Sequence, residues 1–345
     1  MKILHVLNSN KYSGAENVVI NIIKNLSEDV ECFYVSPEGT IREVLENEKI
    51  NYIPIKKLSI KEINKIIKKY NPDVIHAHDF RASIICSRVK FKGKLISQIH
   101  QTPTFLKTWN IKSILYYWST KRYKKIIGVT DAILNNCIFS KKMIQKFVTI
   151  YNCIDKDKII NDALKEQIKE TYDLAFIGRL ESVKNPMRFL QIVKNIKDDG
   201  MNITAIMIGD GTLMDDCKKY IYANNLEKNV KMNGFAKNPF PILNKTKIMV
   251  STSIWEGIPM AILECGALSK PILNNGVGGL EEIFSEMKNM ICKTDYEYKE
   301  KIKTLLNNSD VYRECQRQIE KNLKKFYDMD EYIKNIEKVY KNQNI

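Results

Sequence analysis

The sequence lacks the features that mark membrane-spanning, secreted and zinc-binding proteins. No apolar run reaches the roughly 20 residues that a membrane span needs. The first residues, MKILHVLNSN, are too polar for a secretory signal and fit a first β-strand that ends in a polar loop. The eight cysteines form no Cys-x-x-Cys pair and no His/Cys cluster with zinc spacing, so we expect reduced thiols in the core. A cytoplasmic protein is therefore expected.

Acidic residues are nearly absent from one segment. Residues 81–146 carry 14 Lys or Arg and a single acid, Asp131, whereas residues 1–80 carry 11 of each sign. Residues 147–345 carry 30 basic and 28 acidic residues, so almost all of the net charge of +15 lies in 81–146. A coding bias toward lysine would not remove acids from one segment. The pattern predicts a basic surface suited to an anionic partner.

Aromatic residues are interleaved with this charge in TFLKTWNIKSILYYWSTKRYKK, residues 104–125. The mixture is typical of a helix at a membrane interface, with aromatic rings at the boundary and cations over anionic head groups. It predicts a peripheral contact with the inner face of the cell membrane through 81–146. An ordinary amphipathic helix whose aromatic residues face the core would show the same spacing.

Short apolar runs with strand character alternate with amphipathic helical segments along most of the chain. Such alternation predicts an α/β fold with parallel sheets. We expect two doubly wound, Rossmann-like domains facing a central cleft, over 1–153 and 171–325, with a charged linker at 154–170. The last stretch, about 326–345, is helical and has no strand after it. Ligands of such sheets bind beyond the carboxyl ends of the strands.

Two carboxylates stand out in STSIWEGIPMAILECGALSKPILNNGVGGLEE. Glu256 lies in a loop after an expected strand, and Pro259 is placed to begin the helix that follows. That helix is apolar almost all round, yet Glu264 lies in its middle, which is costly unless the carboxylate has a partner. A pair of sugar or ribose hydroxyls would serve, and so would a structural Arg or Lys.

Two cations follow another expected strand in AFIGRLESVKN. Arg179 and Lys184 in this loop would hold a diphosphate and neutralise the charge that develops as it leaves. A solvated basic loop is the alternative, because most surface cations have no ligand.

Three glycine turns lie at equivalent places. Gly209 in Gly-Asp-Gly opens a helix after a strand, and Gly14 opens the first helix, where backbone N–H groups approach a phosphate. A glycine at either place may equally serve only a tight turn. Asn233 and Phe235 flank a third glycine after the next strand.

The region from Glu256 onward resembles the retaining GT-B glycosyltransferases of family four. Their signature is Glu-x7-Glu, then a Lys/Gly-Pro strand and a glycine-rich turn; here these are Glu256, Glu264, Lys270-Pro271-Ile272-Leu273, Gly276, Gly278, Gly279 and Glu282. The segments at Arg179, Gly209 and Asn233 also match, so the resemblance extends from Gly14 to the last helix. Asn274-Asn275 before the turn, and Ser13 in place of a glycine, depart from the pattern.

The resemblance implies a role for each of these residues. Glu256 would bind hydroxyls of the donor sugar and Glu264 the ribose, with Gly257, Ile258, Pro259, Gly14, Gly209, Asn233 and Phe235 also in the donor site. The second domain would hold a nucleoside-diphosphate sugar, UDP being the most frequent nucleotide in the family. The first domain would hold the acceptor, with the C-terminal helix crossing back to it.

The implied reaction transfers a hexosyl or N-acetylhexosaminyl group, with retention, to a saccharide or a lipid-linked saccharide. Bacterial surface polysaccharide or capsule synthesis fits this chemistry. No carboxylate pair suits a double displacement, and the resemblance implies attack from the front face instead. No Asp-x-Asp motif lies at a strand end, so we expect no metal, and we expect no other cofactor. Arg179, Lys184 and helix N-termini would stabilise the leaving diphosphate.

The chain has four histidines. His5 is expected in the core of the first strand. We expect His76 and His78 on opposite faces of their strand, and we exclude zinc because no third ligand stands nearby in the sequence. His100 ends a strand and opens the loop QTPTF, residues 101–105. It matches the family position that reaches the donor sugar and the acceptor side, so we expect it to act in catalysis.

Three alternatives remain open at this point. A GT-B sugar epimerase would share fold and donor but would release its product without an acceptor. A nucleic-acid-binding protein would bind DNA or RNA in a salt-dependent manner, but it leaves Glu256 and Glu264 unexplained, so we expect no nucleic acid. An inactive scaffold that keeps the fold is the third.

Overall fold

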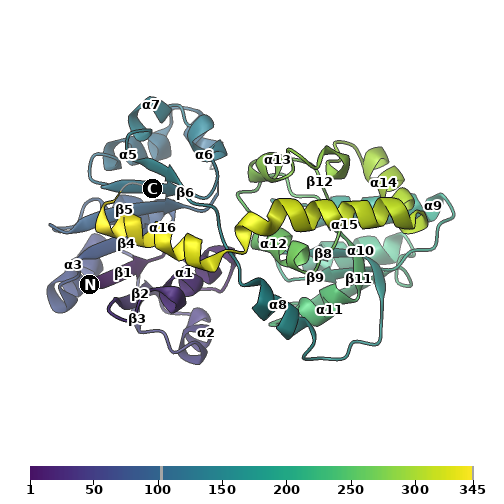
Figure 1. Cartoon of the computed structure of the whole chain (residues 1–345), viewed down its shortest axis with the longest axis horizontal. Helices are drawn as coiled ribbons and strands as arrows, with labels where there is room; N and C mark the ends of the chain where they lie inside the picture. The colour runs from purple at the N-terminus through teal and green to yellow at the C-terminus, as the bar shows by residue number, and fades with distance from the viewer. Residues whose placement is uncertain (102–103, 344–345) are drawn as a thin grey trace. The chain divides into compact units, whose positions relative to one another are not determined.

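The computed structural model describes residues 1–101 and 104–343 of the chain (Figure 1). It divides into two compact units. Unit 1 comprises residues 1–153 together with the C-terminal segment from Asp328, and unit 2 comprises Ile154–Tyr327. Each unit is built around one parallel sheet, which confirms the α/β prediction. Within the described ranges, no helix has both the length and the apolar character needed to cross a membrane.

Unit 1 contains a seven-stranded sheet in the order β3-β2-β1-β4-β5-β6-β7. Its strands are β1 (Lys2–Val6), β2 (Glu31–Pro37), β3 (Tyr52–Ile55), β4 (Val74–His78), β5 (Lys94–Ile99), β6 (Lys125–Gly128) and β7 (Phe147–Thr149). All six neighbouring pairs run parallel. The central strand β4 is buried at every position, because helices cover both faces of a parallel sheet of this kind.

The helices of unit 1 follow the strands in turn. They are α1 (Gly14–Asn25), α2 (Ile41–Asn47), α3 (Ile60–Tyr70), α4 (Phe80–Cys86), η1 (Thr104–Lys107), α5 (Ile111–Ser119), α6 (Ala132–Asn135), α7 (Ser140–Met143) and α16 (Met329–Lys341). Helix α3 shows how local sequence sets the ends. The Ser59 side chain accepts a hydrogen bond from the Glu62 backbone N–H at the start, and Asn71, at φ 45°, ends the helix before Pro72.

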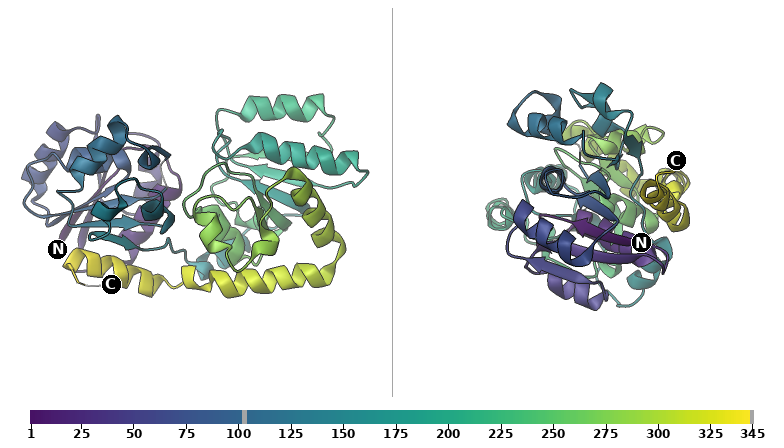
Figure 2. Two further views of the ribbon diagram at one scale, coloured as in Figure 1. Left: turned by 90° about the horizontal axis from the view of Figure 1, so that it is seen from above. Right: turned by 90° about the vertical axis from the view of Figure 1, so that its left-hand side faces the viewer.

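The C-terminal helix α16 belongs to unit 1. It packs against α1 and crosses the sheet near β4 (Figures 1 and 2). There the Tyr340 hydroxyl bonds to His76, and the Lys94 ammonium donates to the Tyr340 carbonyl. Tyr340 and Ile336 on its inner face are fully buried. A stripe of apolar residues on an otherwise charged helix accounts for this docking.

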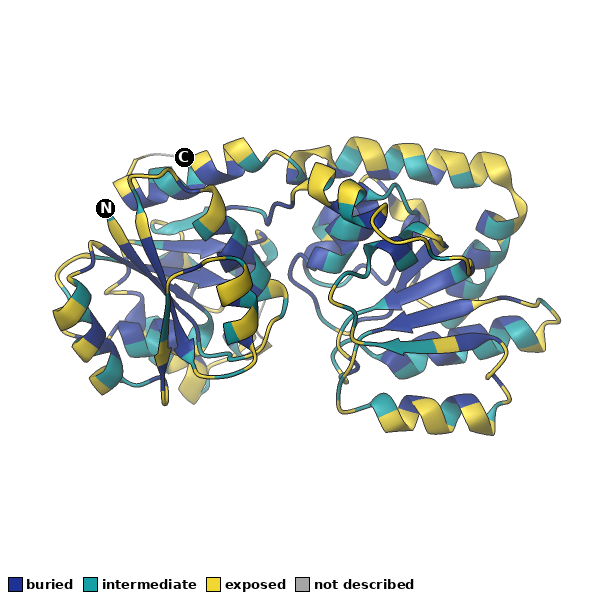
Figure 3. Cartoon of the chain, turned by 90° about the horizontal axis from the view of Figure 1, so that it is seen from below, coloured by how far each residue is buried: buried dark blue, intermediate teal, exposed yellow. Residues whose placement is uncertain are grey.

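Unit 2 contains a five-stranded sheet in the order β10-β9-β8-β11-β12. Its strands are β8 (Tyr172–Ile177), β9 (Ala205–Ile208), β10 (Val230–Gly234), β11 (Thr246–Ser251) and β12 (Ile272–Asn274). Its helices are α8 (Lys156–Ala163), α9 (Pro186–Asp198), α10 (Met214–Ala223), α11 (Phe240–Asn244), α12 (Met260–Ala267), α13 (Gly279–Ile283), η2 (Lys288–Met290), α14 (Asp295–Asn307), α15 (Ser309–Leu323) and η3 (Lys324–Phe326). Figure 3 shows the buried strands between helices whose outer faces are exposed.

The segment that we expected to be a linker is partly helical. Residues 156–163 form α8, which packs against α11 and α12 and so belongs to unit 2. Its charged residues are what made the segment look like a linker. In the structure the Asp155 side chain caps the helix by accepting a hydrogen bond from the Lys158 backbone N–H, and Ile159 and Ala163 form the buried face. A short, charged helix needs only two buried residues to dock.

Strand order fixes where each unit can bind a ligand. In unit 2 the first strand, β8, lies between β9 and β11, so successive connections leave it toward opposite sides of the sheet. The crevice beyond the carboxyl ends of β8 and β11 is the topological switch point, where doubly wound sheets bind ligands. The corresponding point in unit 1 lies between β1 and β4.

Candidate active site

The two loops that meet at the switch point of unit 2 join Lys184 to Glu256. Lys184 Nζ lies 2.5 Å from Glu256 Oε1, and the Ser253 hydroxyl donates to the same oxygen at 2.5 Å. The loops are also tied through their backbones, since the Ile254 N–H donates to the Val183 carbonyl at 2.8 Å. Both charged side chains are largely buried, 19% and 9% exposed. Two of the predicted site residues therefore form one charge-compensated unit.

The glycine-rich turn after β12 supports the Glu256 loop from behind. Gly278 has φ +58°, and a Cβ there would lie 2.0 Å from the Glu256 carbonyl oxygen. A Cβ on Gly279 would lie 2.1 Å from the Gly257 carbonyl oxygen, and the Gly279 N–H donates to the Glu256 carbonyl. Only glycine permits two backbones to approach so closely. The turn thus sets the position of Glu256.

Glu264 lies on α12 as predicted, and none of the described residues forms an ion pair or hydrogen bond with its carboxyl group. Burial raises the pKa of Glu264 to about 7, and the positive charge of Lys158 opposes that rise. Lys158 itself bonds to Asp162. The structural alternative, a dedicated Arg or Lys partner, is therefore absent from the described part of the chain.

Arg179 extends from the end of β8 and is exposed. Its guanidinium makes no hydrogen bond or ion pair with the described residues. The loop that carries it is packed on the Gly209 turn: Gly209 has φ +142°, and a Cβ there would lie 2.0 Å from the Gly178 carbonyl oxygen. The Leu180 N–H donates to the Asp210 carbonyl. Gly209 thus has a structural task, because its close approach holds the loop that carries Arg179.

The remaining predicted donor residues of unit 2 occupy the same edge. Gly257 and Ile258 are buried, and Pro259 is the residue before α12, whose first turn carries no acidic side chain. Asn233 and Phe235 lie at the end of β10, with the Phe235 ring 66% exposed. No described contact fixes the ring of Phe235, which is unusual for so large an apolar group.

Three residues that the sequence analysis did not select as site residues hold this edge together. They are Ser253, Asn275 and Lys293. The Asn275 amide donates to the Ser253 carbonyl at 2.7 Å, and Lys293 Nζ donates to the Asn275 carbonyl at 3.0 Å. The departure at Asn274-Asn275 is thereby explained, because both amides brace the turn: the Gly276 N–H donates to the Asn274 side chain. The consecutive asparagines Asn274 and Asn275 are the feature of the sequence that could have indicated these contacts.

In unit 1, Gly14 is the exposed first residue of α1. The preceding Ser13 hydroxyl donates to the buried carboxylate of Glu16. At the same switch point, Asp79 accepts hydrogen bonds from the backbone N–H groups of Asn8 at 2.7 Å and Ala82 at 2.6 Å. These bonds stiffen the turns that follow β1 and β4.

The prediction that His76 and His78 lie on opposite faces of their strand is wrong, and so is the premise that no third ligand stands near them. The rings of His76 and His78 lie 3.8 Å apart, because residues two positions apart in a strand share a face. His5, on the neighbouring strand β1, is the partner of His76 in the sheet, so a third imidazole does lie beside them. The ligand atoms of these three residues lie within 4.8 Å of one another. Sequence distance was a poor guide, because the sheet brings β1 beside β4.

His100 follows β5 and is half-buried. Its Nε2 lies 3.3 Å from His78 Nδ1, so the residue expected to act in catalysis joins the histidine group. Of the loop 101–105 that it opens, residues 102 and 103 lie outside the described ranges. His5, expected in the core, is fully buried.

The basic segment presents apolar side chains at the surface. Of fourteen large exposed hydrophobic residues in the described chain, six lie between 109 and 144: Trp109, Ile111, Ile114, Trp118, Ile138 and Ile144. Other aromatic residues of the segment, Tyr116 and Tyr123, are fully buried. The aromatic rings of this segment are therefore divided between the surface and the core.

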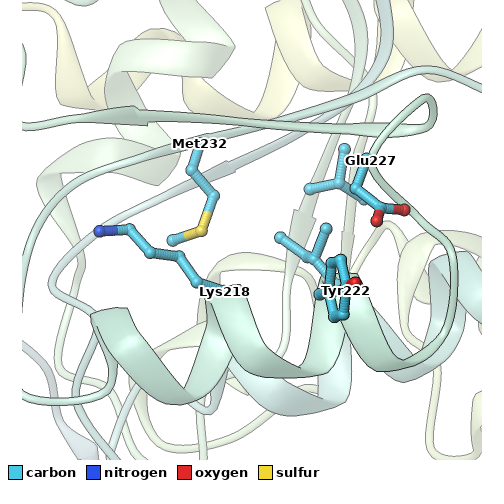
Figure 4. A pocket seen from close by; sticks show the side chains of 6 residues that line it. Lys218, Tyr222, Glu227 and Met232 are labelled. Carbon is cyan, nitrogen blue, oxygen red and sulfur yellow. The ribbon is translucent and has the colours of Figure 1, made fainter.

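The eight cysteines are all free and buried, as expected. A surface pocket lies elsewhere in unit 2, between α10 and β10 (Figure 4). Its lining includes Lys218, Tyr222, Glu227 and Met232, and contains no predicted site residue. The charged ends of Lys218 and Glu227 stand apart at its two sides (Figure 4), so they do not converge on one ligand.

Two family descriptions match consecutive parts of the chain. Glycosyltransferase Family 4 matches residues 12–158, and Glycosyl transferases group 1 matches residues 158–326. The boundary between them falls in α8, close to the boundary between the two units.

Relatives with names are also glycosyltransferases. The chain is 27% identical over 302 residues to the capsular polysaccharide biosynthesis glycosyltransferase CapH of Staphylococcus aureus, covering 80% of this chain and 82% of CapH. It is 26% identical over 242 residues to the UDP-Gal:alpha-D-GlcNAc-diphosphoundecaprenol alpha-1,3-galactosyltransferase of Escherichia coli, covering 64% of this chain and 62% of that enzyme.

A solved structure is similar over nearly the whole length. Anabaena HepE, in its complex with UDP and glucose, has a TM-score of 0.88 at 17% identity, covering 99% of this chain and 100% of HepE. At that level of identity the likeness concerns the fold, and it agrees with the predicted GT-B architecture of two parallel-sheet domains.

Proposed function

The chain belongs to the glycosyltransferases of the GT-B fold, and from this premise we propose that it transfers a sugar, with retention, from a UDP-sugar to a lipid-linked saccharide. The product would be a hexosyl or N-acetylhexosaminyl saccharide of a bacterial surface polysaccharide. The relatives named above act, by their names, in capsule synthesis and on a diphosphoundecaprenol-linked sugar. Their agreement supports this class of acceptor.

One observation carries the proposal: a carboxylate and a cation without a partner among residues 1–101 and 104–343 belong to the edge of unit 2 that holds a compensated ion pair. Burial raises the pKa of the Glu264 carboxyl group to about 7, and the loop that carries Arg179 is tightly fixed. A half-buried carboxyl group kept without a partner costs stability, which a bound ligand would restore. Ribose hydroxyls for Glu264 and a diphosphate for Arg179 match the chemistry of the two groups.

The leaving diphosphate would be met by positive groups from two sources. Arg179 supplies a fork of N–H donors, and Lys184 a point charge. Helix α9 begins at Pro186, two residues after Lys184. It has no acidic residue in its first turn and no side-chain cap, so the N–H groups at its start favour an anion. These groups would stabilise the charge that develops on the diphosphate as the glycosidic bond breaks.

Retention would proceed by attack on the face from which the diphosphate leaves. Glu256 is a poor candidate for a covalent nucleophile, because its Oε1 accepts bonds from both Lys184 and Ser253. A compensated carboxylate is better suited to orienting sugar hydroxyls through its other oxygen. The acceptor hydroxyl itself would then attack the anomeric carbon.

The acceptor would be reached at a membrane surface. Trp109, Ile111 and Trp118 are exposed in or beside α5, with side chains 54%, 78% and 61% exposed. The same stretch of sequence carries Lys107, Lys112, Lys121, Lys141 and Lys142. Of these, Lys121 lies over the Trp118 ring, with Nζ 5.0 Å from the ring centroid. We propose that this face of unit 1 rests on anionic lipid at the inner side of the cell membrane, with the rings in the interface and the ammonium groups over phosphates.

A direct assay tests the function. Purified protein is first screened by thermal shift with UDP-, GDP- and ADP-sugars, and the stabilising donor is then incubated with a diphospho-lipid-linked saccharide. The anomeric proton of the product reports the stereochemistry. Transfer from an α-linked UDP-sugar to give an α-linked product is expected. A β-linked product would refute retention, and release of free sugar without an acceptor would favour an epimerase or a hydrolase.

A further inference from the structure

Three residues with hydroxyl side chains follow one another where β11 ends and the loop that carries Glu256 begins. Ser251 is the last residue of the strand, and Thr252 and Ser253 come directly after it. All three are buried, and Thr252 is fully buried. Because buried polar groups are hydrogen-bonded in folded proteins, the partners of these residues show what each of them holds in place.

The Thr252 hydroxyl group holds the loop that carries Lys184. Its Oγ1 lies 2.8 Å from the carbonyl oxygen of Asn185 and 3.2 Å from that of Lys184, so one hydroxyl proton is shared between two adjacent carbonyls. Asn185 has φ +51°, a conformation that residues other than glycine keep only where their surroundings fix it. Helix α9 begins at the next residue, Pro186. Thr252 therefore fixes the backbone of Lys184 and the start of α9 together.

The Ser253 hydroxyl group holds a carboxylate, not a backbone. It donates to Glu256 Oε1 at 2.5 Å, and the same oxygen accepts a bond from Lys184 Nζ. Within residues 1–101 and 104–343, no hydrogen bond or ion pair involves Glu256 Oε2. A carboxylate with one oxygen held by two donors has a defined orientation about its terminal bond. Ser253 thereby helps to determine which oxygen of Glu256 stays open.

Buried neighbours fix the backbone on both sides of Thr252. The Asn275 amide donates to the Ser253 carbonyl at 2.7 Å, and the Tyr298 hydroxyl donates to the Ser251 carbonyl at 2.6 Å. Both donor side chains are buried, and a hydrogen bond is stronger away from water. The end of β11 is therefore held firmly enough to position the groups bonded to it.

We propose that Thr252 and Ser253 are positioning residues with separate tasks in the donor site. Thr252 would set the diphosphate side of the site through Lys184 and the start of α9. Ser253 would set the sugar side through Glu256, whose Oε2 accepts from a sugar hydroxyl group. Both hydroxyl protons are already used within the protein, so neither residue needs to touch the donor. The inference rests on the proposed function for what the two sides bind, whereas the contacts that hold the loops belong to unit 2 alone.

The effects of the two residues should be separable, because they act on different parts of the donor. UDP and every UDP-sugar share the diphosphate, but only a UDP-sugar carries the group that Glu256 would orient. Loss of the Thr252 hydroxyl group should therefore weaken the binding of UDP itself. Loss of the Ser253 hydroxyl group should slow transfer and leave UDP binding unchanged. A general loosening at the end of β11 would change both properties together.

Calorimetric titration of the whole protein with UDP tests the role of Thr252. In Thr252→Val, which nearly keeps the shape of the side chain and removes the hydroxyl group, UDP should bind about tenfold more weakly, as expected for a lost bond that fixes a charged group. Thr252→Ser restores the hydroxyl group, so its UDP affinity should stay within about threefold of wild type. Equal UDP affinity in Thr252→Val and wild type would overturn the inference.

Ser253→Ala is compared by the same titration and by the transfer assay. Its turnover number should fall by about tenfold, while its affinity for UDP should stay within about twofold of wild type. Ser285→Ala makes the same change at an exposed position of unit 2 and should alter neither property. An equal loss of UDP affinity in Ser253→Ala and Thr252→Val would overturn the separation of tasks, and so would full turnover in Ser253→Ala.

Hydrogen exchange at Ile254 measures the connection between the two loops without any ligand. The Ile254 N–H donates to the Val183 carbonyl at 2.8 Å and so joins the loop after β11 to the loop after β8. In Thr252→Val this amide should exchange about tenfold faster, and in Thr252→Ser and Ser253→Ala it should exchange within about threefold of wild type. Unchanged exchange in Thr252→Val would contradict the claim that Thr252 holds the lysine loop.

Failure of folding and failure of the proposed function give different results. Should Thr252→Val unfold before the assay, Thr252→Ala removes the same hydroxyl group with a smaller side chain and is compared with Thr252→Ser by both measurements. A wild-type protein that binds no UDP would refute the proposed function, and exchange at Ile254 would still decide whether Thr252 holds the loop. UDP binding by wild type together with equal UDP affinities in all variants would refute the positioning and leave the proposed function intact.

Discussion

Lys184 Nζ and Glu256 Oε1 lie 2.5 Å apart, although 72 positions separate the two residues in the sequence. The bond joins the loop after β8 to the loop after β11 at the switch point of unit 2. It couples the residue proposed to hold the diphosphate to the residue proposed to hold the sugar. Each of them therefore depends on the other for charge compensation as well as on the ligand.

Removing either partner should abolish transfer while the fold survives. Glu256→Ala loses the sugar contact, and Lys184→Ala loses a diphosphate cation and leaves a carboxylate supported by Ser253 alone. We expect turnover to fall by roughly 10²–10³ in each, the range for removal of a group that stabilises developing charge. Lys218→Ala on α10 is the matched control, since that lysine is 62% exposed and forms only a loose contact with Asp215. Near-full activity in either site variant would refute the assignment of the site.

UDP affinity should depend on pH through Glu264. Burial raises the pKa of the Glu264 carboxyl group to about 7, above its value in the unfolded chain. Between about pH 4.5 and 7 the folded protein without ligand therefore holds a proton on Glu264 that the unfolded chain has released. That contribution to stability is present at low pH and is lost as pH rises through 7. Ribose binding needs the ionised form, so UDP affinity should fall when pH drops from 8 to 6.

Glu264→Gln should remove this pH dependence and weaken UDP binding by about tenfold, the loss expected for a charge-assisted hydrogen bond. The free variant should melt no lower than wild type at pH 8, because it no longer buries an unpaired charge. Calorimetric titration with UDP at both pH values measures the two effects. A wild-type affinity that is flat from pH 6 to 8 would contradict the role of Glu264.

The Gly278 turn should tolerate no side chain. An alanine Cβ would lie 2.0 Å from the Glu256 carbonyl oxygen, so the Glu256 loop must move, and φ +58° adds strain. We expect Gly278→Ala to lose activity and roughly 3 kcal/mol of stability. Gly200→Ala is the control, since φ is +82° there but no atom lies within 4 Å of the added Cβ. It should cost only about 1–2 kcal/mol and leave activity intact. Equal effects of the two variants would show that the contact with Glu256 is unimportant.

Binding to anionic vesicles should depend on the exposed rings of unit 1. Trp118→Glu places a negative charge on the proposed face and should weaken binding at low salt by about tenfold, through loss of interfacial burial and of charge attraction. Tyr222→Glu makes the same change at a side chain that is 77% exposed on α10 of unit 2. It should bind as wild type does in vesicle sedimentation. Failure of the wild-type protein to bind anionic vesicles at low salt would refute the membrane proposal.

The parts of the fold that depend on local chemistry could be predicted. Strand–helix alternation predicted two parallel sheets, and each unit contains one. The boundary near residue 153 also lies where the composition changed. Helix α8 was missed, because its charges resemble those of a linker and only Ile159 and Ala163 dock it to its neighbours.

The pairings across strands could not be predicted from sequence distance. His5 lies beside His76 because β1 and β4 are neighbours in the sheet. The residues of the two strands do not determine that strand order. The prediction for His76 and His78 failed for a different reason. Side chains two positions apart in a strand lie on the same face of the sheet, so the sequence alone already placed the two rings side by side. For the same reason, the sequence did not decide whether Glu264 pairs with a structural Arg or Lys. Such a partner can come from a residue far away in the chain.

Hydrogen exchange of the full chain with and without UDP tests the central claim most directly, because it reports which backbone segments the nucleotide protects. The donor site described here predicts slower exchange in the loop from Gly178 to Asn185, in the Gly209 turn and at the start of α12, with no change around Lys218 and Met232. UDP that binds without protecting the Arg179 loop and the start of α12 would contradict it, and so would protection confined to the pocket between α10 and β10.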